Sequence, residues 1–555
     1  MQRRGLARGA LGLLAFVSVA TWVAGLSAVR ASGHVAAVND LRPEPSALAQ
    51  VPLDDDAHWD GRVEGALARL AAGAAGTITR DEAPILLAGT SAMNQALSLS
   101  SVAAPRSESA TLHRRLRQMV AKLPARASAS VHVRDLRSGE VLFDHAGDVP
   151  RNPASTQKLL TSAAAIELLG PDYRFETRLH RRGGVVYLVG EGDPSLLLDD
   201  IYNMLSESHL ELDPEPVHTI VVDDTAFSDV RFGPGYDANG PDPSYLAPSS
   251  ACSANFNTVE VVVSSSKDGA NIQVTPRSTA VTIDDRTSRR GGPLRVLTRP
   301  SSNGKGTVVV VHGRPPKVGK TQTIRRRVLT PSYFTGGILA NLIAELRDQP
   351  PPRVVRGSLL PDAPLRATHK SRRLVSVLRS ALTFSNNFTI EQVLRTLAWR
   401  ATTNPGTWAE GISILERYWR AIGGDDDQLV IVNGAGLSSQ GRIDAQGLVS
   451  IIERIQRPGT RAHLLVSSMA RPGAEGTLRS RLTDLGPVVI AKTGTLSRSS
   501  ALAGMVLDQD GARPLGFAVL VEGAPLHVAR AFQDSLARTL YRHLHVAPEH
   551  APARP

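Results

Sequence analysis

The stretch NPASTQKLLTSAAAIELLG, from Asn152 to Gly170, places a serine and a lysine three residues apart at the start of an apolar run. Residues three apart lie on one face of a helix, so Ser155 and Lys158 would point the same way. Pro153 favours the start of a helix and Gly170 favours its end. The apolar stripe that would bury this helix consists of Leu159, Ala163, Ile166 and Leu169.

This pair has a chemical and a structural interpretation. A serine hydroxyl is a weak nucleophile at neutral pH, so it needs a base within reach. Lysine can be that base when burial and the positive end of a helix lower its pKa. The alternative is that Ser155 caps a helix and Lys158 is solvated. Two more S-x-x-K copies, Ser264–Lys267 and Ser302–Lys305, lie in a predicted strand end and a predicted turn, where no helical face holds the pair.

Two other motifs follow along the chain. TFSNNF supplies S-x-N at Ser385 and Asn387, on a loop between two predicted helices, and VVIAKTGTLS supplies K-T-G at Lys492, Thr493 and Gly494. Their structural alternatives are a turn with a helix cap and a strand that ends in a turn. An edge strand of this composition can also pair with a substrate backbone, which the glycine lets come close, and can hold a carboxylate. The three motifs in this order are far more specific than any one of them.

Together, S-T-Q-K, S-N-N and K-T-G resemble the motifs of the serine penicillin-recognising enzymes, which are the penicillin-binding proteins and serine β-lactamases. Lys158 and Ser385 are 227 positions apart. A long insert at this place resembles the low-molecular-mass class C penicillin-binding proteins, the D-alanyl-D-alanine carboxypeptidases and endopeptidases of the bacterial envelope. The resemblance implies an α/β (α+β) fold, in which a β-lactamase-like transpeptidase domain is interrupted by a β-rich insert.

The resemblance also implies roles for individual residues. Ser155 would attack the carbonyl between two D-alanines, and Lys158 would take the serine proton. Ser385 and Asn387 would complete a proton relay and hydrogen-bond the amide side of the substrate.

The K-T-G segment would bind the other end of the substrate. Lys492 and Thr493, followed by Gly494, would hold the terminal carboxylate. The backbone N–H groups of Ser155 and Thr495 would form the oxyanion hole. No metal and no organic cofactor is implied.

The implied function is a serine D-alanyl-D-alanine carboxypeptidase/endopeptidase that acts on peptidoglycan stem peptides and cross-links through an acyl-enzyme, with β-lactam antibiotics as covalent inhibitors. Two alternatives stay open. A β-lactamase or esterase of the same fold would hydrolyse a penicillin quickly, and a non-catalytic cell-wall-binding protein would form no covalent adduct.

The order of helical and β-rich segments along the sequence predicts an interrupted domain. β-branched runs such as VVYLVG, HTIVVDD and GTVVVVHG lie between two regions with helical periodicity. The predicted organisation is an N-terminal extension, partly disordered, at 32–111, catalytic segments at 112–175 and 371–546, a β-rich insert at 176–370 and a disordered tail at 547–555.

The N-terminus predicts export. Arg3, Arg4 and Arg8 precede an uncharged stretch from Ala10 to Val29, and small residues follow. Residues 1–31 are therefore predicted to be an export signal or a membrane anchor. If they are an anchor, residues 10–29 would hold the protein at the membrane. The expected location is the periplasm or cell envelope.

Composition limits the other partners. The formal net charge is +11 and only eight residues are lysine. Such a charge could serve a nucleic acid, a membrane surface or an anionic polymer, or simply be a solvated Arg-rich surface. We expect no nucleic-acid partner, because no basic helix with interleaved aromatics is present. Cys252 is the sole cysteine, so no internal disulfide can form and a structural zinc site is not expected.

Overall fold

The computed structural model describes residues 106–545, apart from 211–212, 237–242 and 267–268. The predicted signal or anchor at 1–31, most of the predicted extension and the predicted tail therefore lie outside the described residues. Helix α4 (Arg106–Ala121) begins inside the predicted extension. Within the described part of the chain, no helix is long and apolar enough to cross a bilayer.

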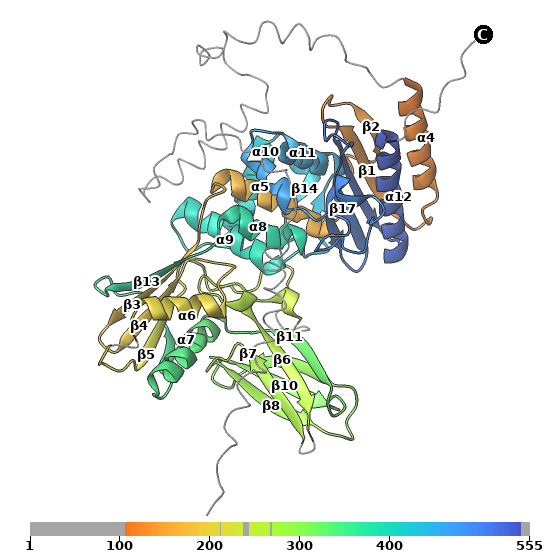
Figure 1. The fold of residues 1–555 in the computed structure, drawn as a ribbon. Coiled ribbons are helices and arrows are strands. Elements are labelled where there is room, and N and C mark those ends of the chain that lie inside the picture. Colours follow the sequence, from red (N-terminus) through yellow and green to blue (C-terminus); the bar gives the residue numbers. More distant parts are fainter. Residues whose placement is uncertain (1–105, 211–212, 237–242, 267–268, 546–555) are drawn as a thin grey trace, which may run out of the picture. The chain divides into compact units, whose positions relative to one another are not determined.

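The catalytic part is built on a five-stranded antiparallel sheet in the order β16-β17-β18-β1-β2 (Figure 1). Its strands come from both ends of the described chain, because β1 pairs with β18 from Ser128↔Glu522 to Asp135↔Leu515. The bounds are β1 Ser128–Asp135, β2 Val141–His145, β16 Val489–Thr495, β17 Ser499–Val506 and β18 Leu515–Glu522. The predicted fold class, a domain interrupted by an insert, is confirmed.

Helices cover both faces of this sheet. On one face lie α4 and α12 (Leu526–His545), and on the other lies α11 (Ala445–Gln456). Figure 1 shows α4 and α12 side by side. Because both faces are covered, β17 is buried along nearly its whole length, which accounts for its continuous run of small and apolar residues.

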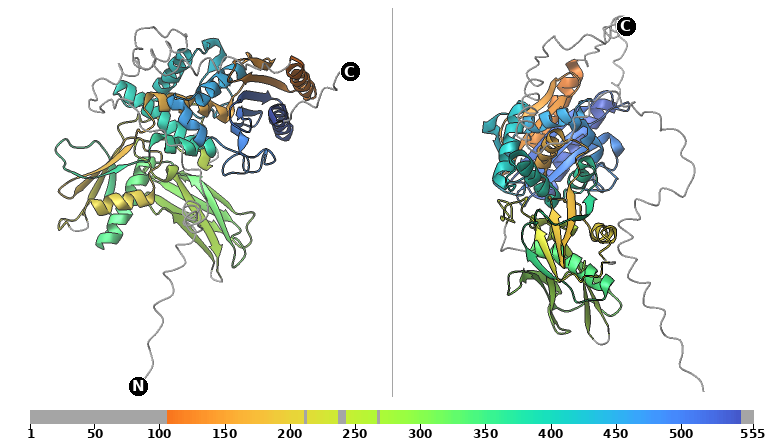
Figure 2. Two further views of the ribbon diagram at one scale, coloured as in Figure 1. Left: turned by 45° about the horizontal axis from the view of Figure 1, so that its top comes forward. Right: turned by 90° about the vertical axis from the view of Figure 1, so that its left-hand side faces the viewer.

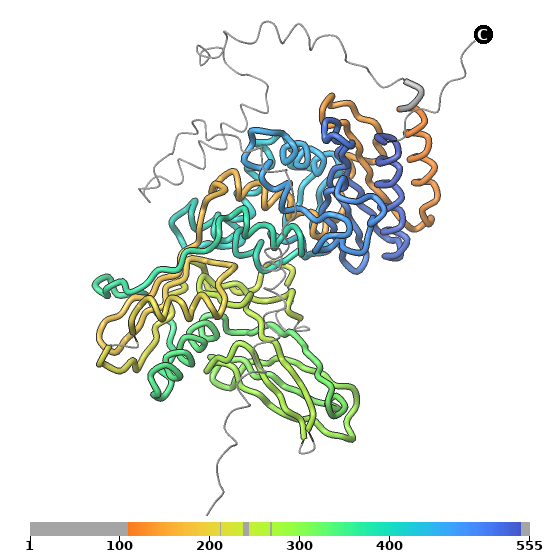
Figure 3. Tube along the Cα trace, in the orientation of Figure 1, coloured from red at the N-terminus to blue at the C-terminus, as the bar shows by residue number. Residues whose placement is uncertain are grey.

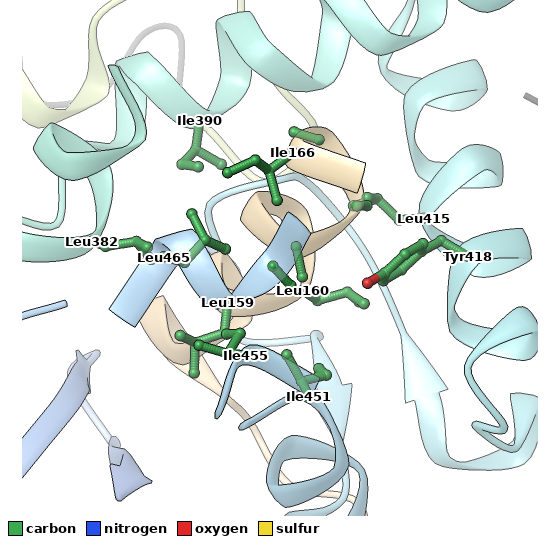
Figure 4. Close-up of a cluster of buried hydrophobic side chains, with 14 of the residues drawn as sticks. Leu159, Leu160, Ile166, Leu382, Ile390, Leu415, Tyr418, Ile451, Ile455 and Leu465 are labelled. Atoms are coloured by element: carbon green, nitrogen blue, oxygen red, sulfur yellow. The ribbon is translucent and has the colours of Figure 1, made fainter. Parts of the chain in front are cut away.

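Helix α5 (Lys158–Leu168) is the centre of the second layer. It is surrounded by α8 (Leu374–Thr383), α9 (Asn387–Thr402), α10 (Trp408–Ala421) and α11. Figure 4 shows its Leu159, Leu160 and Ile166 among apolar side chains of these neighbours.

Two details of this helix differ from the sequence prediction. Ser155 lies in a 3₁₀ turn, η3 (Ala154–Gln157), and the α-helix begins only at Lys158. The predicted apolar residues Leu159, Ala163 and Ile166 are buried, but burial is not limited to one stripe, because every residue from Lys158 to Leu168 is buried. Polar Thr161 and Glu167 can be buried because they find partners: Thr161 donates to the Gly434 carbonyl and Glu167 accepts from Arg454.

The described residues of the insert form three sheets and two α-helices. One sheet has the strand order β12-β5-β4-β3-β13, and two three-stranded sheets have the orders β8-β10-β9 and β11-β6-β7 (Figure 2). The strands are β3 Glu176–Arg182, β4 Val185–Gly190, β5 Thr219–Asp223, β6 Thr258–Ser265, β7 Ala270–Thr275, β8 Val281–Thr287, β9 Arg295–Pro300, β10 Thr307–Gly313, β11 Thr321–Arg327, β12 Arg353–Arg356 and β13 Leu365–Lys370.

The helices α6 (Leu198–Glu207) and α7 (Pro331–Arg347) were not predicted. In α7 the adjacent Gly336 and Gly337 weaken helix propensity. The structure supplies the reason for one of them, because a Cβ at Gly336 would come within 2.6 Å of a Val354 side-chain carbon. Close packing of α7 on the sheet therefore overrides local propensity.

The two ends of the insert meet. Its first strand, β3, pairs with its last strand, β13, from Glu176↔Lys370 onward. The chain thus leaves and re-enters the catalytic part at neighbouring points, as the trace in Figure 3 shows. An insert of this kind can interrupt a domain without separating the strands of its sheet.

Candidate active site

The turn that carries Ser155 is held in an uncommon backbone conformation. Ala154 has a φ of 44°, in the left-handed region that a residue with a side chain rarely adopts. Gly494 of β16 packs against it, since a Cβ at Gly494 would lie 2.6 Å from the Pro153 carbonyl oxygen. Gly436 has a φ of +70°, and a Cβ there would collide with the Ala154 carbonyl. The turn is therefore fixed from two sides.

Lys158 lies beside Ser155 and is fully buried. Its Nζ donates to three oxygens, each at 2.8 Å: Ser155 Oγ, Asn387 Oδ1 and the Ala435 carbonyl. Burial lowers the pKa of Lys158 to about 7, although the nearby carboxylate of Glu391 acts in the opposite direction. A large fraction of Lys158 is therefore neutral at physiological pH.

The three contacts orient the neutral amine. Asn387 Oδ1 and the Ala435 carbonyl can only accept hydrogen bonds, so they take the two N–H groups of a neutral lysine. Its lone pair is then left for Ser155 Oγ, which can donate its proton. This is the arrangement that a general base beside its nucleophile requires.

The S-x-N residues come from the start of α9. Asn387 is the first helical residue, and the Asn386 side chain caps the helix by accepting from the Thr389 N–H. Ser385 has a φ of 63°, so both serines of the site lie at or beside a left-handed residue.

Lys492 connects the second and third motifs. Its buried Nζ donates to Ser385 Oγ at 2.9 Å and to the Thr493 carbonyl at 2.8 Å. Burial, and then the charge of Lys158, hold the pKa of Lys492 well below its ordinary value. Strand β16 lies at the end of the strand order, as predicted for an edge strand.

The structure brings Ser155, Lys158 and Asn387 into direct contact and joins Ser385 to Lys492. The remaining K-T-G residues lie on the same strand: Thr493 is buried, Gly494 faces the Ser155 turn rather than open space, and Thr495 is exposed. Of the other S-x-x-K copies, Ser302 and Lys305 are exposed in a turn, while Lys267 is not among the described residues.

With this geometry in place, comparison with known proteins is informative. The model of the D-Ala-D-Ala carboxypeptidase 3 (S13) family matches residues 112–543. The chain belongs to this family. The predicted class, a serine-type D-Ala-D-Ala carboxypeptidase of the low-molecular-mass class C penicillin-binding proteins, is confirmed.

Relatives of the S13 family cover most of the chain. A D-alanyl-D-alanine carboxypeptidase of Actinomadura sp. (strain R39) is 30% identical over 452 residues, which are 77% of this chain and 83% of that protein. Carboxypeptidase DacB of Mycolicibacterium smegmatis is 26% identical over 74% of this chain and 79% of its own length. The crystal structure of penicillin binding protein 4 from Haemophilus influenzae matches with a TM-score of 0.66 at 21% identity, over 77% of this chain and 99% of its own, and so supports the fold.

One buried group of this S13 site was missed by the sequence analysis. Glu391 lies on α9, one helical turn after Asn387, and is almost completely buried. Its carboxylate accepts from the N–H groups of Ala435 at 2.9 Å and Gly434 at 3.3 Å, and from Trp408 Nε1 at 2.7 Å. The sequence does contain a feature that indicates Glu391, because its i,i+4 spacing from Asn387 predicts that both side chains lie on one helix face.

Proposed function

We propose that this protein hydrolyses the terminal D-Ala-D-Ala bond of peptidoglycan stem peptides, and cuts their cross-links, through an acyl-enzyme on Ser155. The observation that carries the proposal is the buried Lys158 Nζ, held 2.8 Å from Ser155 Oγ by two carbonyl acceptors. Membership of the S13 family supports the reaction class.

In the acylation step, Ser155 Oγ attacks the carbonyl carbon between the two D-alanines, and its proton moves to the neutral Nζ of Lys158. The oxyanion accepts hydrogen bonds from the backbone N–H groups of Ser155 and Thr495, a contribution worth about 3 kcal/mol per donor. Collapse of the tetrahedral intermediate breaks the C–N bond, and the leaving nitrogen takes a proton that returns through Lys158 and Ser385.

The K-T-G strand binds the substrate's carboxylate. Lys492 and Thr493 hold it, and its negative charge favours the ammonium form of Lys492, which burial disfavours in the free protein. Water then hydrolyses the ester on Ser155 and restores the serine. When the leaving amine belongs to a neighbouring stem peptide, the same steps open a cross-link.

The proposal extends to β-lactams. A solved structure of the Haemophilus influenzae protein holds a β-lactam, and this chain carries a nucleophile–base pair on the same fold. Attack of Ser155 on the strained lactam carbonyl opens the ring, and the leaving nitrogen stays attached, so the acyl-enzyme persists.

A fluorescent penicillin tests the nucleophile. Peptide mapping is expected to place the adduct on the peptide that contains Ser155. Ser155→Ala is expected to abolish labelling with an unchanged circular dichroism spectrum, while Ser302→Ala labels normally. An adduct on another serine would contradict the assignment.

Mass spectrometry of the products separates the three candidate activities. Purified stem pentapeptide and cross-linked dimer are expected to yield D-alanine and monomer respectively. Rapid release of hydrolysed penicillin would instead identify a β-lactamase, and the absence of any adduct would identify a non-catalytic wall-binding protein.

The location is proposed from the sequence. Residues 1–31, with Arg3, Arg4 and Arg8 before the uncharged stretch, support export to the periplasm or cell envelope, either cleaved or held at the membrane through residues 10–29. Fractionation of the native host is expected to place the protein outside the cytoplasm.

A further inference from the structure

The positive charge of the chain is concentrated in one part of the insert. Between Thr258 and Thr330 the sequence holds 14 Lys and Arg residues against four Asp and Glu residues, a net charge of +10. The whole chain has a net charge of +11, so the rest is almost neutral. A merely Arg-rich composition would spread the excess evenly, so this concentration needs a local explanation.

This stretch forms the sheets β8-β10-β9 and β11-β6-β7, and most of its cations face solvent. Carboxylates offset few of them: Asp284 pairs with Arg286 and Arg299, and Glu260 pairs with Arg325. In the part of the chain that the structure describes, exposed cations of this stretch without an ion pair are Arg290, Arg295, Lys305, Arg314, Lys317 and Lys320.

Some of these cations line a hollow of about 280 Å³. It lies between the β6–β7 hairpin, the end of β8 and the loop after β10. Arg314 and Lys317 line it together with the hydroxyl-bearing Ser265, Thr287 and Ser288. Cations and hydroxyl donors around one hollow are the groups that bind a carboxylate.

We propose that the sheets β8-β10-β9 and β11-β6-β7, with the described loops between their strands, form an electrostatic docking surface for peptidoglycan, bound through the carboxylates of its stem peptides. The proposal rests on the proposed function, which requires only the last residues of one stem peptide at Ser155. Peptidoglycan beyond those residues is a repeating polyanion. Many weak contacts to its carboxylates add up through multivalency. Such contacts are screened by salt, whose Debye length is about 8 Å at physiological ionic strength.

Co-sedimentation with purified sacculi tests the docking surface. The full chain is expected to sediment at low salt and to be released by salt of about 1 M. A variant with Arg290, Arg314, Lys317 and Lys320 changed to Glu is expected to lose at least tenfold in affinity, while kcat/KM on a soluble D-Ala-D-Ala peptide stays unchanged. If the wild-type protein does not hydrolyse the soluble peptide, that result would instead disprove the proposed function.

The matched control reverses the same number of exposed basic residues elsewhere: Arg115, Arg117, Arg137 and Arg530 to Glu. Because the net charge changes equally, this control is expected to bind sacculi like the wild type. Equal losses in both variants, or none in either, would overturn the docking surface. Sacculi stripped of attached phosphate polymers are expected to bind equally well, and failure to bind them would overturn peptidoglycan as the occupant.

A second, independent observation concerns Glu391. The loop from Asn433 to Ala435 lies between α9 and α5, and the carbonyls of these three residues accept from Gln157 Nε2, Thr161 Oγ1 and Lys158 Nζ respectively. On its other side, the loop's N–H groups donate to Glu391. Glu391 therefore fixes the two peptide groups that directly precede the Ala435 carbonyl, the acceptor that holds Lys158.

The structure assigns to Glu391 the role of a positioning residue that holds the loop of the Ala435 carbonyl and so sets the direction of Lys158. Its carboxylate faces three N–H donors, which a protonated carboxyl would satisfy poorly. Burial raises the pKa of Glu391, while these donors and the charge of Lys158 lower it. The other titratable or charged groups that face this pair are Lys492, Tyr236 and Arg395.

The pH dependence of acylation tests this role. Because the negative charge of Glu391 raises the pKa of Lys158, Glu391→Gln is expected to move the acid limb of the acylation rate to lower pH. The plateau rate is expected to fall about tenfold to a hundredfold, since the loop that carries the Ala435 carbonyl is no longer held by the carboxylate.

Glu167→Gln is the matched control. Glu167 is a buried carboxylate on α5 itself, held by Tyr418 and Arg454. Its substitution is expected to lower the melting temperature without moving the acid limb. An unchanged acid limb in folded Glu391→Gln would overturn the role of Glu391.

Discussion

At the scale of single residues, two buried lysines differ because of their neighbours. Lys158 faces three oxygens and the carboxylate of Glu391, whereas Lys492 faces a serine hydroxyl and its neighbour's carbonyl. Burial and the charge of Lys158 lower the pKa of Lys492 well below its ordinary value, and a carboxylate bound beside Lys492 would favour its ammonium form.

The first prediction concerns Lys158. Below its pKa of about 7 the ammonium form has no lone pair for the serine proton, so the acylation rate should rise with pH through about 7 and then level off. Lys158→Ala should lower the plateau by about 10²–10⁴-fold. Stopped-flow acylation by a chromogenic penicillin at several pH values measures both, and a flat profile between pH 5 and 9 would exclude Lys158 as the base.

The second prediction concerns Lys492. Lys492→Ala should raise KM for acyl-D-Ala-D-Ala peptides and slow acylation, at a cost of about 2–5 kcal/mol. A peptide with a C-terminal amide lacks the anion and serves as the matched ligand. The variant should lose little on the amide, so the two changes should be strongly non-additive. Equal losses of activity on both peptides would show that Lys492 does not bind the terminal carboxylate.

At the scale of elements, the site depends on how closely three segments approach. Strand β16, the turn η3 and the loop at Gly436 meet at Ala154, and only glycine fits at Gly494 and Gly436. The positive φ of Ala154 is held by these contacts rather than by local preference.

The third prediction therefore compares two glycines. Gly436→Ala should cost about 2–4 kcal/mol of stability and slow acylation about a hundredfold, because the new Cβ meets the Ala154 carbonyl. Gly139→Ala is the control: its φ is +78° but nothing lies within 4 Å of a Cβ there. It should cost only about 1–2 kcal/mol and leave acylation unchanged. Thermal unfolding and penicillin labelling measure both, and similar kinetics in the two variants would contradict this account.

At the scale of the whole described molecule, α9 connects the insert to the active site. Arg395 is fully buried on α9 and donates to Ser249 and Ser228 of the insert and to the Gly406 carbonyl. Its guanidinium lies 4.3 Å from the ring centre of Trp408, which in turn donates to Glu391. The insert therefore contributes to the environment of Lys158 through packed side chains.

The fourth prediction follows from this burial. Arg395→Leu removes the buried guanidinium that donates to the Ser228 and Gly406 carbonyls, so it should destabilise the chain by about 3–5 kcal/mol. The exposed pair Arg420–Asp426 provides the control, where Arg420→Leu should cost less than about 1 kcal/mol. Urea unfolding measures both, and equal costs would show that Arg395 does not anchor the insert.

The order of the three motifs, the interrupted catalytic sheet and the identity of the serine–lysine pair could be predicted from the amino-acid sequence by itself. These features are local, since S-x-x-K, S-x-N and K-T-G are each read within one turn or strand, and the periodicity of β-branched and apolar runs marks the strands and helices around them. The concentration of charge in residues 258–330 is likewise a property of sequence alone.

Only the tertiary structure decided the surroundings of Lys158. The carbonyl of Ala435 contacts Lys158 across a large sequence separation, so no local pattern reveals this contact. Local spacing places Glu391 on the helix face of Asn387, but it does not reveal the hydrogen bonds of Glu391 to the loop of Ala435. The burial of Lys158 on all sides and the contact of Gly494 with the Ser155 turn also depend on elements that meet only in the fold. The physical reason is that desolvation and hydrogen-bond direction are set by distant neighbours, whereas propensity and periodicity are set by adjacent residues.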